Sequence, residues 1–153
     1  MLKPALRAAC GTIPIASPAA DAALAVPRIL CSLLLAIDFG MSKFPTPQWF
    51  IDDVGKLGFP APTFFAWAAV LSEVFASFLL ALGLATRLNA ALVCVTMLVA
   101  AFVQKWDAST WEKLPSLFFF LNAYTALILG SGRFGLDRFI RKRLGGPSYA
   151  RPS

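Results

Sequence analysis

Residues 62–84 read PTFFAWAAVLSEVFASFLLALGL, an apolar run with one carboxylate, Glu73, near its middle. About 20 consecutive apolar residues are enough to cross the hydrocarbon core of a bilayer as an α-helix. An ionisable side chain at that depth costs roughly 2.5–3.5 kcal/mol on insertion scales, so it is usually paired, protonated or hydrated. The run therefore predicts a transmembrane helix that keeps a polar group inside the protein.

Three further apolar runs, over about 26–44, 88–105 and 115–129, predict three more spans. The composition agrees, because 58% of the residues are hydrophobic and 14% are charged, with a mean hydropathy of +0.70. We therefore expect an all-α integral membrane four-helix bundle. Its four spans occupy residues 26–132, residues 1–25 form a mobile cytoplasmic arm, and residues 133–153 form a basic cytoplasmic tail.

Two shorter segments are amphipathic. Between residues 46 and 58, Trp49, Phe50 and Val54 recur at helical spacing opposite acidic and basic residues, which predicts a short helix in the outer interface. Within residues 134–144, Leu136, Phe139 and Ile140 form an apolar patch opposite the basic residues, which predicts a basic amphipathic helix on anionic lipid. The basic residues expected at the membrane surface are Arg87, Arg138, Arg141, Lys142 and Arg143.

The basic residues also predict the orientation of the chain. If the chain crosses the membrane four times, both termini lie on the same side, and ten of the fourteen Lys and Arg residues lie on that side too. Positive residues mark the cytoplasmic side of a membrane protein, so both termini should be cytoplasmic. Since topology and lipid headgroups account for the net charge of +6, no nucleic-acid partner is expected.

Candidate site residues lie within the predicted bundle. On the first span, a stripe at steps of three and four residues joins Arg28, Cys31, Leu35, Asp38 and Ser42. Arg28 either reaches the cytoplasmic headgroups or acts as a countercharge inside the bundle, and Asp38 is either structurally paired or part of a functional site. The candidate intramembrane polar site comprises Glu73, Asp38, Arg28, Lys43 and Asn122. Histidine is absent and the three cysteines are scattered, so no metal site is expected.

Four stretches resemble the DoxX family of small bacterial membrane proteins. They are Arg28 followed by Gly40–Met41–Ser42–Lys43–Phe44, residues 57–62 leading to Glu73, the turn over residues 83–88, and Gly-Ser-Gly-Arg-Phe-Gly-Leu-Asp over residues 130–137. The sequence departs from the pattern at Phe39 and near Gln104, where many relatives have histidine.

The resemblance implies a four-span protein of the bacterial inner membrane, with some relatives linked to oxidoreductase systems. We therefore expect a membrane subunit or partner of a redox system, at most an accessory subunit of an oxidoreductase, with quinone as the candidate cofactor. The alternatives are a non-catalytic scaffold or stabilising module and a small transporter. The expected partners are the lipid bilayer and a redox enzyme, and the small-residue helix faces leave a homo-oligomer open.

Overall fold

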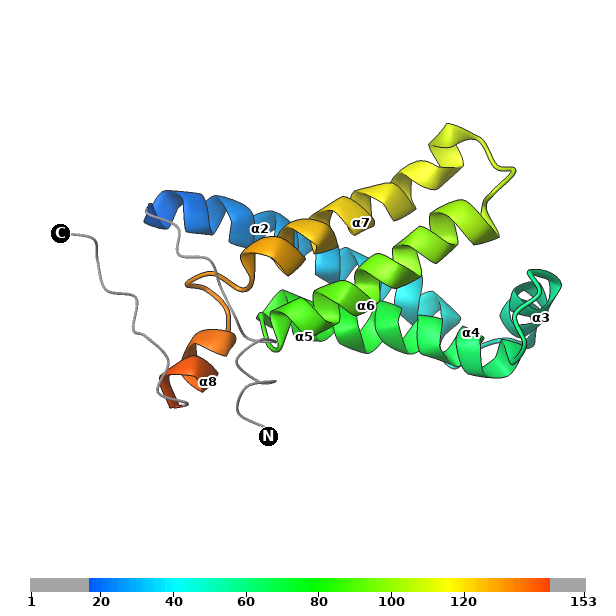
Figure 1. Cartoon of the computed structure of the whole chain (residues 1–153), viewed down its shortest axis with the longest axis horizontal. Coiled ribbons are helices and arrows are strands. Elements are labelled where there is room, and N and C mark those ends of the chain that lie inside the picture. The colour runs from blue at the N-terminus through cyan, green and yellow to red at the C-terminus, as the bar shows by residue number, and fades with distance from the viewer. Residues whose placement is uncertain (1–16, 144–153) are drawn as a thin grey trace.

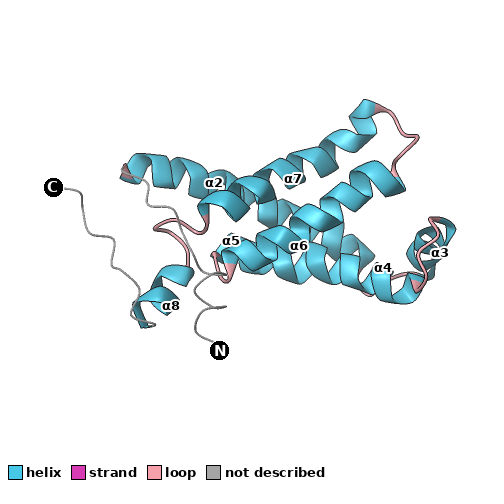
Figure 2. Ribbon diagram, in the orientation of Figure 1, coloured by secondary structure: helices cyan, strands magenta, loops and turns pink. Residues whose placement is uncertain are grey.

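The computed structural model describes residues 17–143, with side chains described through Ile140. Every regular element of this part of the chain is helical (Figure 2). The elements are α2 (Pro18–Leu34), η1 (Leu35–Gly40), η2 (Met41–Lys43), α3 (Gln48–Lys56), α4 (Pro62–Leu71), η3 (Ser72–Ala76), α5 (Ser77–Leu82), α6 (Thr86–Val99), η4 (Ala100–Gln104), α7 (Thr110–Leu129) and α8 (Asp137–Arg143).

The elements form a bundle of long helices with two distinct ends (Figure 1). Helix α8, the start of α2 and the α5–α6 turn lie at one end, which we call the α8 end. Helix α3 and the α6–α7 loop lie at the opposite end, which we call the α3 end. Helices α6 and α7 pack along each other, and α2 packs on both α5 and α7. Each long helix therefore connects the two ends of the bundle.

Within residues 17–143, three helices are long and apolar enough to cross a membrane. They are the continuous helices Pro18–Lys43, Pro62–Leu82 and Thr86–Gln104, of 26, 21 and 19 residues. Helix α7 has 20 residues, but Glu112, Lys113 and Asn122 make it less apolar than these three. The all-α membrane fold is confirmed, whereas the fourth span stays a prediction.

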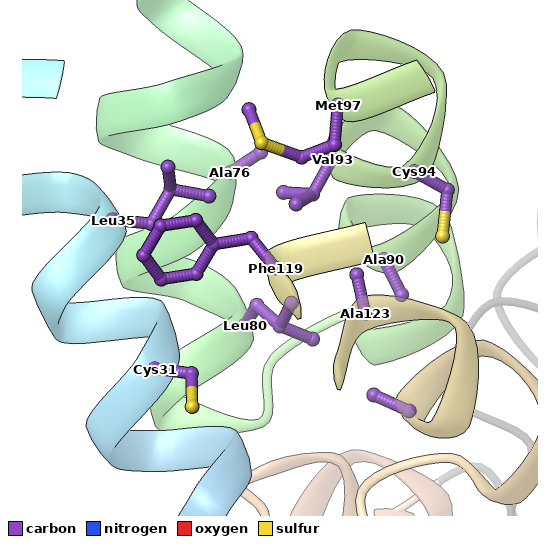
Figure 3. Packing of buried hydrophobic residues seen from close by; sticks show 11 residues of the cluster. Cys31, Leu35, Ala76, Leu80, Ala90, Val93, Cys94, Met97, Phe119 and Ala123 are labelled. Carbon is purple, nitrogen blue, oxygen red and sulfur yellow. The ribbon is translucent and has the colours of Figure 1, made fainter. Parts of the chain in front are cut away.

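The main core lies between α2, α5, α6 and α7. Figure 3 shows Phe119 of α7 among side chains from the other helices, including Leu35 and Leu80. Small residues such as Ala90 and Ala123 are fully buried at the α6–α7 contact, which lets the two backbones approach closely. A second cluster joins α3 to α4 through Phe50, Val54, Ala66, Val70 and Val74. Burial of these apolar side chains positions the short helix α3 against the bundle.

Helix α3 lies inside the segment predicted to form the outer interfacial helix. Its apolar side packs on α4, while Trp49 remains exposed. On its polar side, Lys56 donates a hydrogen bond of 2.8 Å to Asp53. This hydrogen bond and the charge of Asp53 raise the pKa of Lys56 above its ordinary value.

Two helix boundaries differ from the sequence prediction. Helix α2 begins at Pro18, not near Val26, because proline suits the first helical position and Asp21 in the first turn is buried beside Arg133. The predicted N-terminal arm is therefore helical over residues 18–25, and its residues 1–16 lie outside the described part of the chain. Helix α7 begins at Thr110, and Pro115 lies inside it. A hydrogen bond of 2.9 Å from Ser109 to Glu112 accompanies this earlier start.

Each of the three apolar helices contains a π-helical segment, namely η1, η3 and η4. In a π-helix, the hydrogen bonds join residues five apart. The buried side of the first helix therefore continues from Leu35 to Gly40, five residues on, and not to Asp38. The predicted stripe is wrong from Asp38 onward, since Asp38 and Ser42 are exposed. Segments η1 and η3 pack directly against each other.

Candidate functional site

An ion pair joins η2 to η3 toward the α3 end of the bundle. Lys43 Nζ lies 2.7 Å from Glu73 Oε2, and the Lys43 and Glu73 side chains are 20% and 5% exposed. Lys43 Nζ also lies 5.3 Å from the centre of the Phe50 ring, at a distance typical of a cation–π contact. The buried carboxylate is thus paired with a cation from the neighbouring helix, which removes much of the cost of placing it inside the protein.

The close contact between η1 and η3 allows Lys43 to reach Glu73. A methyl group on Gly40 would lie 2.7 Å from Val74 Cγ2 and 3.0 Å from the carbonyl carbon of Glu73. Only a residue without a side chain fits at that separation, so Gly40 lets the two π-helical segments touch. Lys43, which follows in the next turn, then reaches Glu73 across the contact.

Glu73 also lines a cavity of about 490 Å³ between α3, α4, η3 and α6. Most of the wall is apolar and aromatic, with Phe50, Phe59, Phe64 and Phe65 among the lining residues. Polar groups gather on the wall near η3 and η4, where Ser72, Thr96 and Gln104 also line the cavity. The Thr96 and Ser72 hydroxyl oxygens are 3.0 Å apart. An apolar cavity with a few polar groups is typical of a binding site for an amphipathic small molecule.

The other predicted site residues lie elsewhere. Asp38 is exposed on η1, and no hydrogen bond or ion pair joins its side chain to another described residue. Arg28 and Asn122 line a second cavity, between α2 and α7 toward the α8 end. The structure therefore pairs Lys43 with Glu73, and it places Arg28 and Asn122 in the wall of a different cavity.

Arg28 is a buried residue of the bundle. It is 4% exposed, and its Nη1 donates a hydrogen bond of 2.6 Å to the carbonyl oxygen of Leu80. The Arg28 guanidinium therefore lies within the protein, against the backbone of α5. A Cβ on Gly83 would lie 2.7 Å from Arg28 Nη1, so this glycine makes room for the arginine.

The sequence analysis did not identify Asp137 as a site residue. This residue connects the start of α8 to the start of α6. Its carboxylate accepts hydrogen bonds from the backbone N–H groups of Ala85 and Thr86, at 2.7 and 2.9 Å, and from the Thr86 hydroxyl at 2.6 Å. The residue before α6 is Ala85, whose side chain cannot accept a hydrogen bond from the first turn. A helix start without Ser, Thr, Asp or Asn was the signal that an acceptor comes from elsewhere in the chain.

The basic surface residues are only partly described. Arg87 Nη2 donates a hydrogen bond of 3.1 Å to the carbonyl oxygen of Ile128, near the end of α7. Arg138 is exposed on α8 beside the exposed aromatic residue Phe139. Arg141, Lys142 and Arg143 belong to α8, but their side chains lie outside the described part. Of the described residues, none form a group of acidic, cysteine or histidine ligands able to hold a metal ion.

The apolar helices, with a buried ion pair between them, define a small integral membrane protein of the all-helical class. A sequence model of the DoxX family matches residues 23–106, which is more than half of the chain. The chain therefore belongs to the DoxX family. The match includes Arg28, Lys43 and Glu73 and ends before α7. Comparisons with curated proteins and with solved structures gave no match.

Proposed function

We propose that this DoxX-family protein is a membrane subunit of a quinone-linked redox system and binds the quinone in the cavity beside Glu73. The observation that carries the proposal is the buried Lys43–Glu73 pair at the wall of a largely apolar cavity of about 490 Å³. The proposed setting is the bacterial inner membrane, with four spans and both termini cytoplasmic. Electrons would come from a partner enzyme, so the chain would act as an accessory subunit.

The residues of the cavity fit the chemistry of a quinone. The phenylalanines of α3, α4 and the connection between them offer an apolar wall for an isoprenoid tail. Gln104, Ser72 and Thr96 are hydrogen-bond donors that carbonyl oxygens of a ring could accept from. A bound quinone supplies the capacity to take up two electrons and two protons. Glu73, held by Lys43, is the ionisable group at this wall that can hold or exchange a proton.

Photolabelling with an azido-quinone in proteoliposomes tests the cavity. Ala69 lines the cavity, so Ala69→Phe should fill part of it and reduce labelling of the α3–α4 region by about tenfold or more, the effect of roughly 1.4 kcal/mol. Val26→Phe adds the same ring to an exposed position outside the cavity lining and should leave labelling unchanged. Equal labelling of both variants and the parent protein would refute the quinone site.

Glu73→Gln separates a proton-handling role from a packing role. If Glu73 handles protons, the variant should accumulate normally in the membrane, bind the azido-quinone and lose quinone-dependent activity of the reconstituted system. The second candidate function is a non-catalytic stabilising module. The same ion pair favours this function, because it joins η2 to η3. If that contact is essential for folding, the variant should fail to accumulate. Wild-type accumulation together with wild-type activity would exclude both roles for Glu73.

A further inference from the structure

The second cavity, between α2, α7 and the loop that follows α7, has a volume of about 320 Å³. The residues that line this cavity are polar at one end and apolar at the other. Asp21, Arg28 and Ser131 line it toward the α8 end, whereas Cys31, Phe118 and Leu121 line it further into the bundle. The cavity is separate from the proposed quinone site, with which it shares no lining residue.

The polar end of this cavity holds three buried side chains with unmet hydrogen-bonding capacity. Asp21, Arg28 and Ser131 are 2%, 4% and 3% exposed. Within the described part of the chain, Asp21 Oδ1, Arg28 Nη2 and Ser131 Oγ have no hydrogen-bond partner. Buried polar atoms in native proteins nearly always have a partner, so three exceptions at one cavity indicate a polar ligand there.

The charges of these groups define the chemistry of that ligand. Arg28 Nη2 is a cationic hydrogen-bond donor, so an anionic acceptor such as a phosphate would bind it strongly. Asp21 Oδ1 is an acceptor and calls for a donor. Arg133 Nε lies 3.0 Å from Asp21 Oδ2 and so pairs with the other oxygen of the same carboxylate. A headgroup with both an anion and a cationic donor would satisfy Arg28 and Asp21 together.

The extent of the cavity matches a lipid more closely than a soluble ion. Its lining runs from Asp21 to Cys31 on α2, about 15 Å at the helical rise, and from Phe118 to Gly130 on the α7 side, about 18 Å. Asp21, at the polar end, belongs to the first turn of the apolar helix Pro18–Lys43, and the first turn of a helix that crosses a bilayer lies near the lipid headgroups. The apolar end lies deeper, where acyl chains are found.

We propose that this cavity binds one phospholipid whose headgroup carries a primary ammonium group. In this assignment, the phosphate lies against Arg28, the ammonium lies against Asp21, and one acyl chain follows Cys31, Phe118 and Leu121. The proposal does not depend on the quinone site, since it concerns other residues at the opposite end of the bundle.

Native mass spectrometry in an equimolar mixture of phosphatidylethanolamine and phosphatidylglycerol with identical acyl chains tests the assignment. One phosphatidylethanolamine should be retained in about fivefold excess, the ratio that one additional net hydrogen bond supplies. Glycerophosphoethanolamine, which has the same headgroup without acyl chains, should compete poorly. Equal retention of both lipids, or full displacement by the chain-free headgroup, would overturn the assignment.

Thr125→Phe is the variant that tests the location. Thr125 lines the cavity and is exposed, so the larger ring should block the lipid without disturbing the core. Thr63→Phe makes the same change at an exposed threonine that lines neither cavity and serves as the control. Lipid retention should fall at least about fivefold in Thr125→Phe only. A folded Thr125→Phe variant that retains phosphatidylethanolamine would overturn the proposal.

Discussion

Asp137 is the acceptor that completes the start of helix α6. It is fully buried, comes from the beginning of α8, and binds two backbone N–H groups and one hydroxyl 51 or 52 residues earlier in the chain. Because the first N–H groups of any helix lack partners within the helix, an acceptor from another segment also connects that segment to it. Asp137 therefore caps α6 and attaches α8 to the bundle at the same time.

Asp137→Ala should strongly destabilise the protein. Each buried donor left without an acceptor costs about 1–3 kcal/mol, and the variant leaves the Ala85 and Thr86 donors unmet. We expect a clear loss of thermal stability in detergent, measured by circular dichroism and by monodisperse elution. Asp107→Ala, at an exposed position in the α6–α7 loop, is the control and should behave as the parent protein. A melting temperature of Asp137→Ala equal to that of the control would contradict the capping role.

At the scale of elements, the contact between η1 and η3 depends on Gly40, which has no side chain. The segments pack so closely that any side chain at position 40 meets Val74 and the backbone of Glu73. Packing an extra methyl group into a closed contact usually costs about 1–3 kcal/mol. The separation of these two segments also determines whether Lys43 can reach Glu73.

Gly40→Ala should push η1 away from η3 and weaken the ion pair. We expect lower thermal stability and, in the reconstituted system, weaker azido-quinone labelling, because Glu73 lines the labelled cavity. Gly55→Ala is the matched control, since its added methyl group would lie 3.4 Å from Pro62 Cγ, an ordinary packing distance. If the two alanine variants have equal stability and labelling, the close contact is not what positions Lys43.

The sequence was sufficient to predict the apolar helices, the short helix over residues 46–58 and the presence of a buried carboxylate. It was not sufficient to pair Glu73 with Lys43. Steps of three and four residues assume one continuous α-helix, and η1 changes the step to five after Leu35. Asp38 was therefore assigned to the wrong side of its helix. Asp21 and Asp137 were missed because their partners are distant in sequence, and only the folded chain brings them together.

At the scale of the whole molecule, the number of spans determines where the C-terminus lies. In the described part of the chain, three helices are apolar enough to cross the membrane, and α7 packs along one of them, α6. If α7 also crosses, the helix count is even, and both ends of the chain lie on the same side. If it does not, the two ends lie on opposite sides.

Reporter fusions distinguish these two topologies. We expect fusions after Ala85 and after Ser153 to report the cytoplasmic side, and fusions after Gly58 and after Asp107 to report the other side. The expectation follows from four spans and from the excess of Lys and Arg near the termini. A fusion after Ser153 that reports the same side as the fusion after Asp107 would show that α7 does not cross the membrane.

The π-helical segment η1 also determines where the first span tolerates a deletion. In η1, one residue more than an α-helix would need separates the buried positions Leu35 and Gly40. Loss of a single residue within η1 would shorten that step to four, so regular α-helical winding would keep Leu35 and Gly40 on the same side of the helix and Lys43 beside Glu73. Loss of a residue between Arg28 and Leu34, in α2, would instead turn the two parts of the helix by about 100° relative to each other. Arg28 and Lys43 would then not both keep their partners, although both residues were still present. In this protein, the position of a one-residue gap inside the first span thus decides whether its buried contacts survive.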